Sequence, residues 1–334
     1  MTCVFGSRGD RNTVVVLLGV LAVLPLFLVQ RGLTYRASLL VVFLVFAIFT
    51  LALNIVFAHT DQLFLFVGAL AGVSTYTTAL LADVVGVTAW LTLPVGVLAA
   101  GTVGFLVSYV SAHRGMSVIV IAILTLSLQF AASQFFVGAR EITNGSTGFR
   151  FTGLQVPVLS ETIGLSHELS SYYVLLVTLA GTLVLYSWLL RSRFGLAFDA
   201  LRQDDAGAES VGVDVIRYKS IAGFTSAAII GLAGPLFASA ERFVLPSMFS
   251  FQGVDVLVLI MLILGGMRTI LGPVVGAGLV VVLNELLQEF GQWRTVAYGL
   301  LLTVLFLYFS EGIVPKVRTL LGRDGDSHSR ARSG

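Results

Sequence analysis

Long apolar runs recur along almost the whole chain, and they limit its possible folds more than any other feature. A helix that rises about 1.5 Å per residue needs about 20 apolar residues to cross the hydrocarbon of a bilayer. Charged residues make up only 11% of the 334 residues, whereas soluble domains carry roughly 25%. The sequence therefore predicts an all-α, polytopic helix bundle that is integral to a membrane.

The runs predict about ten spans in one transmembrane domain, residues 13–314, between tails at 1–12 and 315–334. The predicted spans are 13–30, 38–57, 63–82, 86–110, 116–137, 172–190, 220–240, 254–264, 271–287 and 296–314. Two are irregular, because 254–264 is short and 63–82 contains Gly68 and Gly72. Transporters break helices at such places, where non-helical backbone is buried in protein or lines a cavity. We therefore expect some short or interrupted helices.

The distribution of positive charge predicts the orientation. Cytoplasmic segments retain Lys and Arg, and placing both termini inside puts fourteen of these residues in inner segments and six in outer ones. We therefore expect a multi-pass protein of the plasma (inner) membrane with both termini in the cytoplasm.

Several kinds of chemistry are excluded by residue types that are missing or scattered. Lys219 and Lys316 are the only lysines, and neither lies in the Gly-Lys-Ser/Thr sequence of a phosphate-binding P-loop. The four histidines lack metal-ligand spacing, which favours solvated or interfacial roles, and Cys3 is alone. A net charge of +2 gives no reason to expect a nucleic-acid partner. The sequence thus predicts a conduit without catalytic residues, cofactor or metal, rather than an enzyme.

Polar residues inside predicted spans are candidates for a translocation pathway, because they are costly in a bilayer. The four candidates are Asn54, Gln129, Asp255 and Glu285. Asp255 and Glu285 fall near the outer ends of their predicted spans, where a carboxylate reaches water. Hydrogen bonding between helices is the alternative role for Asn54 and Gln129, and interfacial contact is the alternative for the two carboxylates.

The inner segment 191–219 is rich in charge and reads as a helix. Leu201, Ala208 and Val211 would give it an apolar side, and Gly212 would end it. It is either a solvated connector or a docking helix that transmits the motion of a separate ATPase. The docking surface would comprise Leu201, Arg202, Gln203, Asp204, Asp205, Ala208, Glu209 and Gly212.

Motifs before and after this segment resemble a known family. The segment is followed by Ile-Gly-Leu-Ala-Gly-Pro-Leu at 230–236, Pro-Ser-Met-Phe-Ser-Phe at 246–251 and Leu-Gly-Gly…Leu-Gly-Pro-Val-Val-Gly-Ala at 264–277. Upstream, Leu-Asn at 53–54, Gln-Leu at 62–63 and Thr-Asn-Gly at 143–145 extend the match. Order and spacing resemble the branched-chain amino-acid ABC transporter permeases of the LivM type.

The resemblance implies a permease subunit of an ATP-binding-cassette importer, for leucine, isoleucine and valine or for urea or short amides. The substrate stays open because Asp61 replaces a glycine of the family pattern, and Phe64 and Phe66 replace small polar residues. The implied partners are a second homologous permease, two cytoplasmic ATP-binding subunits, an extracytoplasmic substrate-binding protein and membrane lipid. Reversing the charges of Asp204 and Asp205 would then uncouple transport from ATP hydrolysis.

Three other classes are alternatives. A secondary transporter would need an acidic residue or an ion site near a span midpoint, and the predicted spans place none there. A structural membrane subunit would not explain the charged inner helix. A membrane-embedded enzyme would need clustered His, Asp or Cys within the spans.

Overall fold

The computed structural model describes residues 16–23, 25, 34–154, 167–287, 296, 299, 300, 303 and 312–320. Within this part, six helices are long and apolar enough to cross a membrane. They are α2 (Thr34–Thr60), α3 (Val67–Val85), α4 (Ala89–His113), α5 (Val118–Gly138), α8 (His167–Arg191) and α11 (Val215–Glu241). The prediction of an all-α membrane bundle is confirmed.

Two apolar helices are shorter. The π-helical turn η3 (Phe251–Asp255) continues into α12 (Val256–Gly265), and α13 spans Gly272–Leu286. Fifteen helical residues reach only about 22 Å, so the prediction of short helices is confirmed at 254–264. The predicted spans 13–30 and 296–314 lie mostly outside the described residues, and α15 (Ile313–Leu320) begins at the end of the second one.

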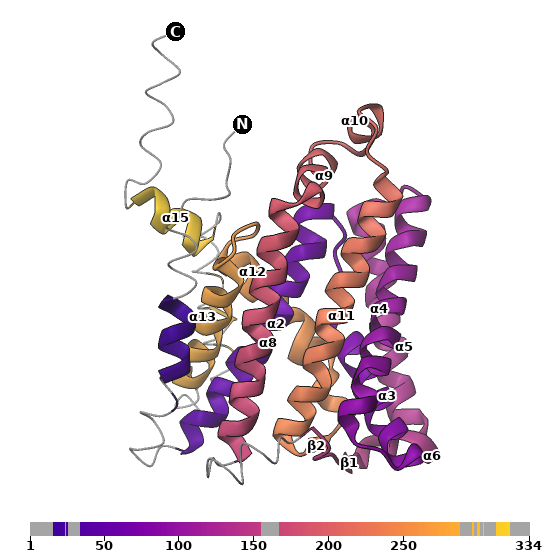
Figure 1. The fold of residues 1–334 in the computed structure, drawn as a ribbon, viewed down its shortest axis with the longest axis vertical. Helices are drawn as coiled ribbons and strands as arrows, with labels where there is room; N and C mark the ends of the chain where they lie inside the picture. The colour runs from indigo at the N-terminus through magenta and orange to yellow at the C-terminus, as the bar shows by residue number, and fades with distance from the viewer. Residues whose placement is uncertain are drawn as a thin grey trace.

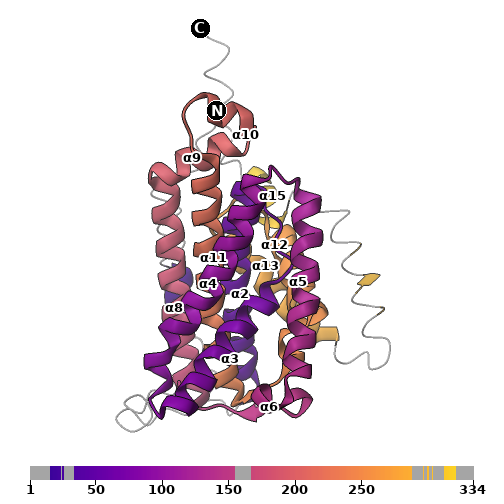
Figure 2. The same ribbon diagram turned by 90° about the vertical axis from the view of Figure 1, so that its right-hand side faces the viewer.

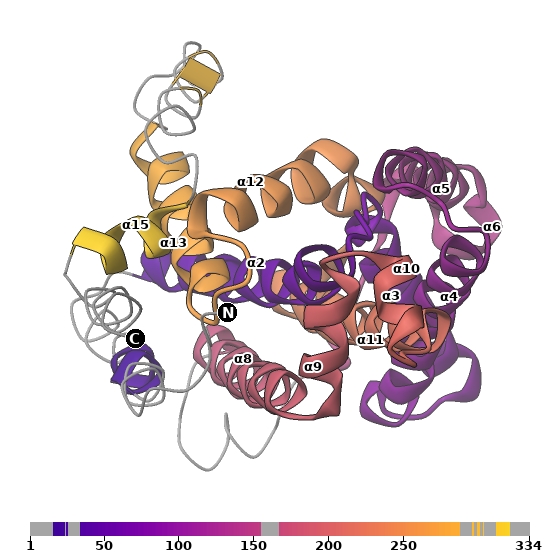
Figure 3. The same ribbon diagram turned by 90° about the horizontal axis from the view of Figure 1, so that it is seen from above.

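Helix α2 lies at the centre of the bundle. Figure 3 shows it between α8 and α12, and 78% of its most apolar window is buried. Its sequence is compatible with this position, because Leu51, Ala52 and Leu53, which point about 100° apart around the helix, are all fully buried, and no charged residue occurs from Ser38 to Thr60. A helix that is apolar all round can be surrounded by lipid or by other helices, and here other helices surround most of α2.

Helices α4 and α11 form the most extensive helix pair, and small residues line their contact. A side chain at Gly104 would overlap the Cβ of Ala227, and one at Gly223 would overlap Ser108. Small residues let helix backbones approach closely, which is how helices gain packing energy in a bilayer that offers no hydrophobic drive between them.

The bundle has two structurally different ends (Figure 1). At one end α9 (Arg193–Leu201) and α10 (Asp205–Ser210) project beyond the long helices. At the other end β1 (Phe149–Arg150) pairs antiparallel with β2 (Phe243–Val244), next to α6 (Arg140–Thr143), η1 (Gly145–Thr147) and η2 (Pro246–Phe249). The turn-rich sequence at 143–148 does form turns, with positive φ at Asn144, Gly145 and Gly148.

The inner segment 191–219 differs from the single helix that we expected. It contains two short helices, because the Asp204 side chain caps a new helix three residues after Leu201. Gly212 ends the second helix with φ +84°, as predicted. Val211 was expected on the apolar side, but it is 73% exposed because it follows the end of α10.

Glycines hold α12 and α13 together as a tight helical hairpin. A side chain at Gly276 would overlap the carbonyl oxygen of Met261, and one at Gly265 would overlap the carbonyl oxygen of Gly272. Rigid backbone atoms surround both positions, so a larger side chain fits only if the two helices move apart.

We expect Gly276→Leu to lower the stability of the purified protein by about 1–3 kcal/mol or more, because the hairpin must separate to accept the side chain. Thermal unfolding in detergent measures this loss. The matched control is Gly181→Leu on α8, where no atom lies within 4 Å of an added Cβ. Equal melting temperatures for the two variants would contradict the packing argument.

Candidate functional site

The chain enters the bundle as extended backbone just before α3. Asp61 turns the chain with φ +53°, and residues 61–66 have no regular secondary structure. Figure 1 shows this segment leaving one end of α2 and running back into the bundle before α3 starts. Gln62, Phe64 and Phe66 are each at most 1% exposed. Within the predicted 63–82 span, residues 63–66 are extended and the helix starts at Val67. Gly68 and Gly72, where we expected an interruption, lie inside the continuous helix α3.

Side chains from distant segments satisfy the backbone donors at the start of α3. The amide of Leu65 donates to Thr125 Oγ1 (3.0 Å), and that of Ala69 donates to Gln129 Oε1 (2.6 Å). The amides of Val67 and Gly68 both donate to Asp255 Oδ1, at 2.5 and 3.4 Å. A helix start leaves such donors unpaired, and its positive dipole end also favours a carboxylate.

This arrangement corrects the expectation for Asp255. Its carboxylate is 1% exposed and does not reach water. The reason is that η2 and η3 carry the chain back into the bundle after β2, so Asp255 meets the start of α3 in the interior (Figure 1). The absence of an acidic residue inside the bundle therefore no longer argues against ion coupling. Asp255 Oδ2 has no hydrogen-bond partner among the described residues.

Gln129 joins the same cluster from α5. Its Nε2 donates to the carbonyl oxygen of Phe249 at 2.7 Å, while its Oε1 accepts from Ala69. The structure thus brings Gln129 and Asp255 together around the start of α3, and every polar atom of Gln129 is hydrogen-bonded to backbone. Glu285 lies half-buried in the last turn of α13 and does not belong to this cluster.

We expect Gln129→Leu to destabilise the protein, because it leaves the Ala69 amide and the Phe249 carbonyl without these partners. Each unsatisfied buried group costs about 1–3 kcal/mol. Thermal unfolding in detergent measures the effect, and Gln134→Leu on the exposed side of the same helix is the matched control. An unchanged melting temperature for Gln129→Leu would show that these hydrogen bonds do not stabilise the start of α3.

A second buried polar cluster surrounds Asn54 in α2. Asn54 Nδ2 donates to Tyr186 Oη (2.8 Å) and to the Thr269 carbonyl (3.3 Å), and its Oδ1 accepts from the Arg268 amide (3.0 Å). His59 Nε2 is also hydrogen-bonded to Tyr186 Oη, at 2.8 Å. Since both ends of the Asn54 amide are occupied, the structure favours the interhelical role over a pathway role.

The Asn54 cluster connects to α9 through an aromatic contact. The ring of Phe198 stacks on His59 with centroids 5.9 Å apart. His59 is 5% exposed, so our expectation of a solvated or interfacial histidine was wrong. His59 is buried because α9 packs over it, and the local sequence gives no signal of that packing. The cluster links α2, α8 and α9 to the turn between α12 and α13.

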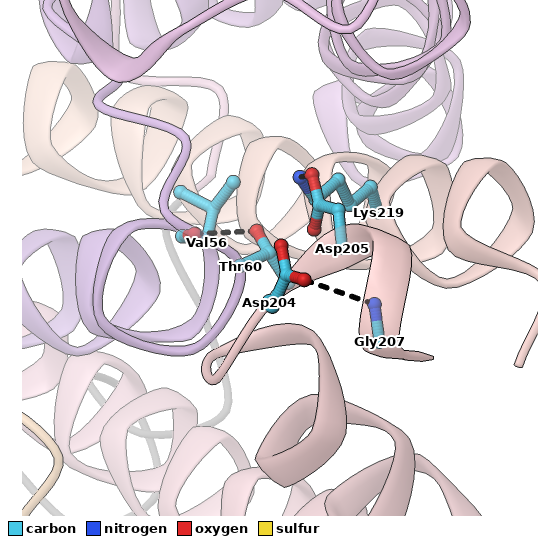
Figure 4. A network of polar contacts seen from close by, with 6 residues as sticks. All are labelled: Val56, Thr60, Asp204, Asp205, Gly207 and Lys219. Carbon is cyan, nitrogen blue, oxygen red and sulfur yellow. Dashed lines mark hydrogen bonds and ion pairs between the residues drawn. The ribbon is translucent and has the colours of Figure 1, made fainter. Parts of the chain in front are cut away.

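Within the segment 191–219, acidic side chains hold the local structure. Asp204 Oδ2 accepts from the Gly207 amide (3.1 Å), and Asp205 Oδ2 pairs with Lys219 Nζ of α11 (2.5 Å), as Figure 4 shows. Leu201 and Ala208 are 3% and 2% exposed, so they anchor the two helices and offer no side-chain surface. Among the predicted docking residues, the exposed ones are Arg202, Gln203, Asp204, Glu209 and Gly212, and Asp205 is half-exposed.

An apolar cavity of about 460 Å³ lies between α3 and α5. Figure 2 shows α5 at the edge of the bundle beside α3. Phe66, Val73 and Leu128 are among its lining residues, and Tyr76 stacks on Phe136 there with centroids 4.7 Å apart. Tyr76 Oη has no hydrogen-bond partner among the described residues.

A membrane-spanning helix bundle with a buried extended segment before α3, buried polar clusters and a helical segment outside the spans fits a transport permease. Residues 35–310 match the family described as the permease component of branched-chain amino acid transport systems. The chain belongs to this family. It is therefore a multi-pass membrane component of an ABC transport system and not a catalytic subunit.

Three relatives illustrate the similarity. The chain is 31% identical to the high-affinity branched-chain amino acid transport system permease protein LivM of Escherichia coli K12, over 95% of this chain and 78% of the relative. Identity to LivM of Salmonella typhimurium LT2 is 30% over the same shares. A probable LivH of Methanocaldococcus jannaschii is 25% identical over 74% of this chain and 80% of the relative. No solved structure matches the chain.

Proposed function

We propose that this chain forms half of the transmembrane pathway of an importer for branched-chain amino acids. The family match across residues 35–310 carries the proposal. The other half would be a second homologous permease, and a substrate-binding protein would deliver the amino acid at the β1–β2 end. Two ATP-binding subunits would dock at the α9–α10 end. We expect the protein to lie in the plasma membrane with both termini in the cytoplasm.

The α9–α10 segment is the proposed coupling element. Closure of the ATP-binding subunits would displace it as one body, because Leu201 and Ala208 are buried and Asp205 is paired with Lys219. The Phe198–His59 contact would pass this displacement to α2. From there, the hydrogen bonds of Asn54 reach α8 and the α12–α13 turn. The bundle would then exchange inward-open and outward-open states.

The cavity between α3 and α5 favours an aliphatic substrate over urea. Its walls are mostly hydrocarbon, and Phe66 is one of the residues that depart from the family pattern. Burying apolar surface stabilises a complex by about 25 cal/mol per Å², and urea has almost no such surface. A permease for urea or short amides is the alternative.

The proposal is tested by purification and reconstitution. We expect the tagged chain, purified from its native membrane in mild detergent, to bring with it a second permease and P-loop ATPase subunits that mass spectrometry identifies. Proteoliposomes with these partners and the binding protein should take up labelled leucine only when ATP is supplied. Excess isoleucine or valine should compete, whereas urea should not.

Two results would contradict the proposal. Uptake by the chain alone, driven by an ion gradient, would favour the secondary-transporter alternative, with Asp255 as its candidate ion site. Competition by urea but not by isoleucine would show that the amide alternative is right.

The ion pair beneath α10 gives a separate test of coupling. We expect Asp205→Lys to reduce ATP-dependent uptake several-fold while the protein still inserts, since it places a second cation next to the largely buried Lys219. The double variant Asp205→Lys, Lys219→Asp restores opposite charges and should recover much of the uptake. Asp199→Lys, at an exposed position of α9, is the control. A double variant as impaired as the single one would argue against the ion pair as the anchor.

A further inference from the structure

Two arginines from different segments converge at the α9 end of the bundle. Arg268 lies in the α12–α13 turn, where its Nε donates to the Ala58 carbonyl (3.0 Å) and its amide donates to Asn54 Oδ1 (3.0 Å). Arg202 directly follows α9, which packs on the same end of α2 through Phe198 and His59. The end of α2 thus holds both residues in position.

No ion pair between either guanidinium group and a carboxylate occurs in the described part of the chain. Burial lowers the pKa of Arg268, the nearby charge of Arg202 lowers it further, and Asp61 raises it. Asp61 is close enough to act on this charge, yet neither arginine forms an ion pair within the described residues. His59 faces the same place, but its Nε2 is occupied by Tyr186. Two positive groups without a partner repel each other, and a carboxylate between them would remove that cost.

Three of the five acidic residues in segment 191–219 have structural roles, and the other two, Asp199 and Glu209, are exposed. Asp204 caps α10, and Asp205 pairs with Lys219. Asp214 caps α11, where its Oδ1 accepts from the Arg217 amide at 3.0 Å. Neither arginine takes part in an ion pair among the described residues, and the planar guanidinium group is well suited to bind a carboxylate through two parallel hydrogen bonds.

We propose that Arg202 and Arg268 together bind a carboxylate side chain of the cytoplasmic ATP-binding subunit. This inference rests on the proposed importer function and adds the chemistry of the partner surface. A single acidic residue would then contact the α9–α10 segment and the α12–α13 turn at once. Movement of the ATP-binding subunit would act on both segments directly, instead of on α9 and α10 alone.

The test measures binding of the purified ATP-binding subunit to the permease pair in nanodiscs. We expect Arg202→Glu and Arg268→Glu each to weaken the apparent affinity at least about tenfold, which corresponds to about 1.4 kcal/mol. Arg268→Lys should weaken binding less than Arg268→Glu does, because lysine keeps the positive charge but loses the paired donors of the guanidinium group. The matched control is Arg114→Glu, an identical charge reversal in the exposed α4–α5 turn on the same side, and it should bind like the wild type.

Salt dependence supplies a second readout that a folding defect would not mimic. Binding of the wild type should weaken as NaCl rises, because salt screens exposed charges, and Arg202→Glu should flatten or invert this dependence. Arg202 is exposed and no side-chain hydrogen bond of it occurs in the described part of the chain, so this variant keeps the fold.

The outcomes separate the two proposals. If the wild-type pair binds no ATP-binding subunit, the importer function fails. If the wild type binds and Arg202→Glu and Arg268→Glu bind as well as Arg114→Glu does, the arginine contact is overturned and the importer function stands. Equal weakening by all three reversals also overturns it, because the attraction would then be general to this face.

Discussion

The backbone donors at the start of α3 impose the condition on which the rest of this bundle depends. Water is scarce inside a membrane protein, so a chain that leaves helical structure there must find partners for its amides within the protein. Here the partners are Thr125, Gln129 and Asp255, which come from α5 and from the junction of η3 with α12. The position of α5 and the return of the chain after β2 are both consequences of that need.

A second set of buried polar contacts holds the C-terminal end of α2. There one asparagine, one histidine and one tyrosine join four segments through hydrogen bonds and a ring contact. Arg268 has a left-handed backbone conformation with φ +66°, which is unfavourable for a residue with a side chain. The hydrogen bond that its backbone amide donates to Asn54 Oδ1 helps to hold it in this conformation. The turn between α12 and α13 is therefore shaped by α2 as much as by its own glycines.

Most helices could be predicted from the sequence because each apolar run carries its own signal. The extended segment before α3 was not foreseen, because Gly68 and Gly72, where we expected an interruption, lie inside the continuous helix and instead permit close contacts with Phe249 and Phe136. The depth of Asp255 was not foreseeable. It depends on a non-helical return after β2, and residues 246–250 have no periodicity that reports direction. Tyr186 and Arg268 lie 132 and 214 positions after Asn54, so no spacing rule joins these residues. Asp204 and Asp205 were recognised as important, but a sequence does not tell a capping carboxylate from a docking one.

The modest packing of α5 has a mechanical consequence. Only 17% of its most apolar window is buried within this chain, and Thr125 and Gln129 attach it to the first turn of α3 and to Phe249. Pulling α5 away would strip these amides and one carbonyl of their partners in the same step. The contact between α5 and the start of α3 would therefore separate only where water replaces the lost hydrogen bonds. Hydration of these backbone groups would then accompany the separation of α3 and α5, so water would not reach the interior here before the two helices separate.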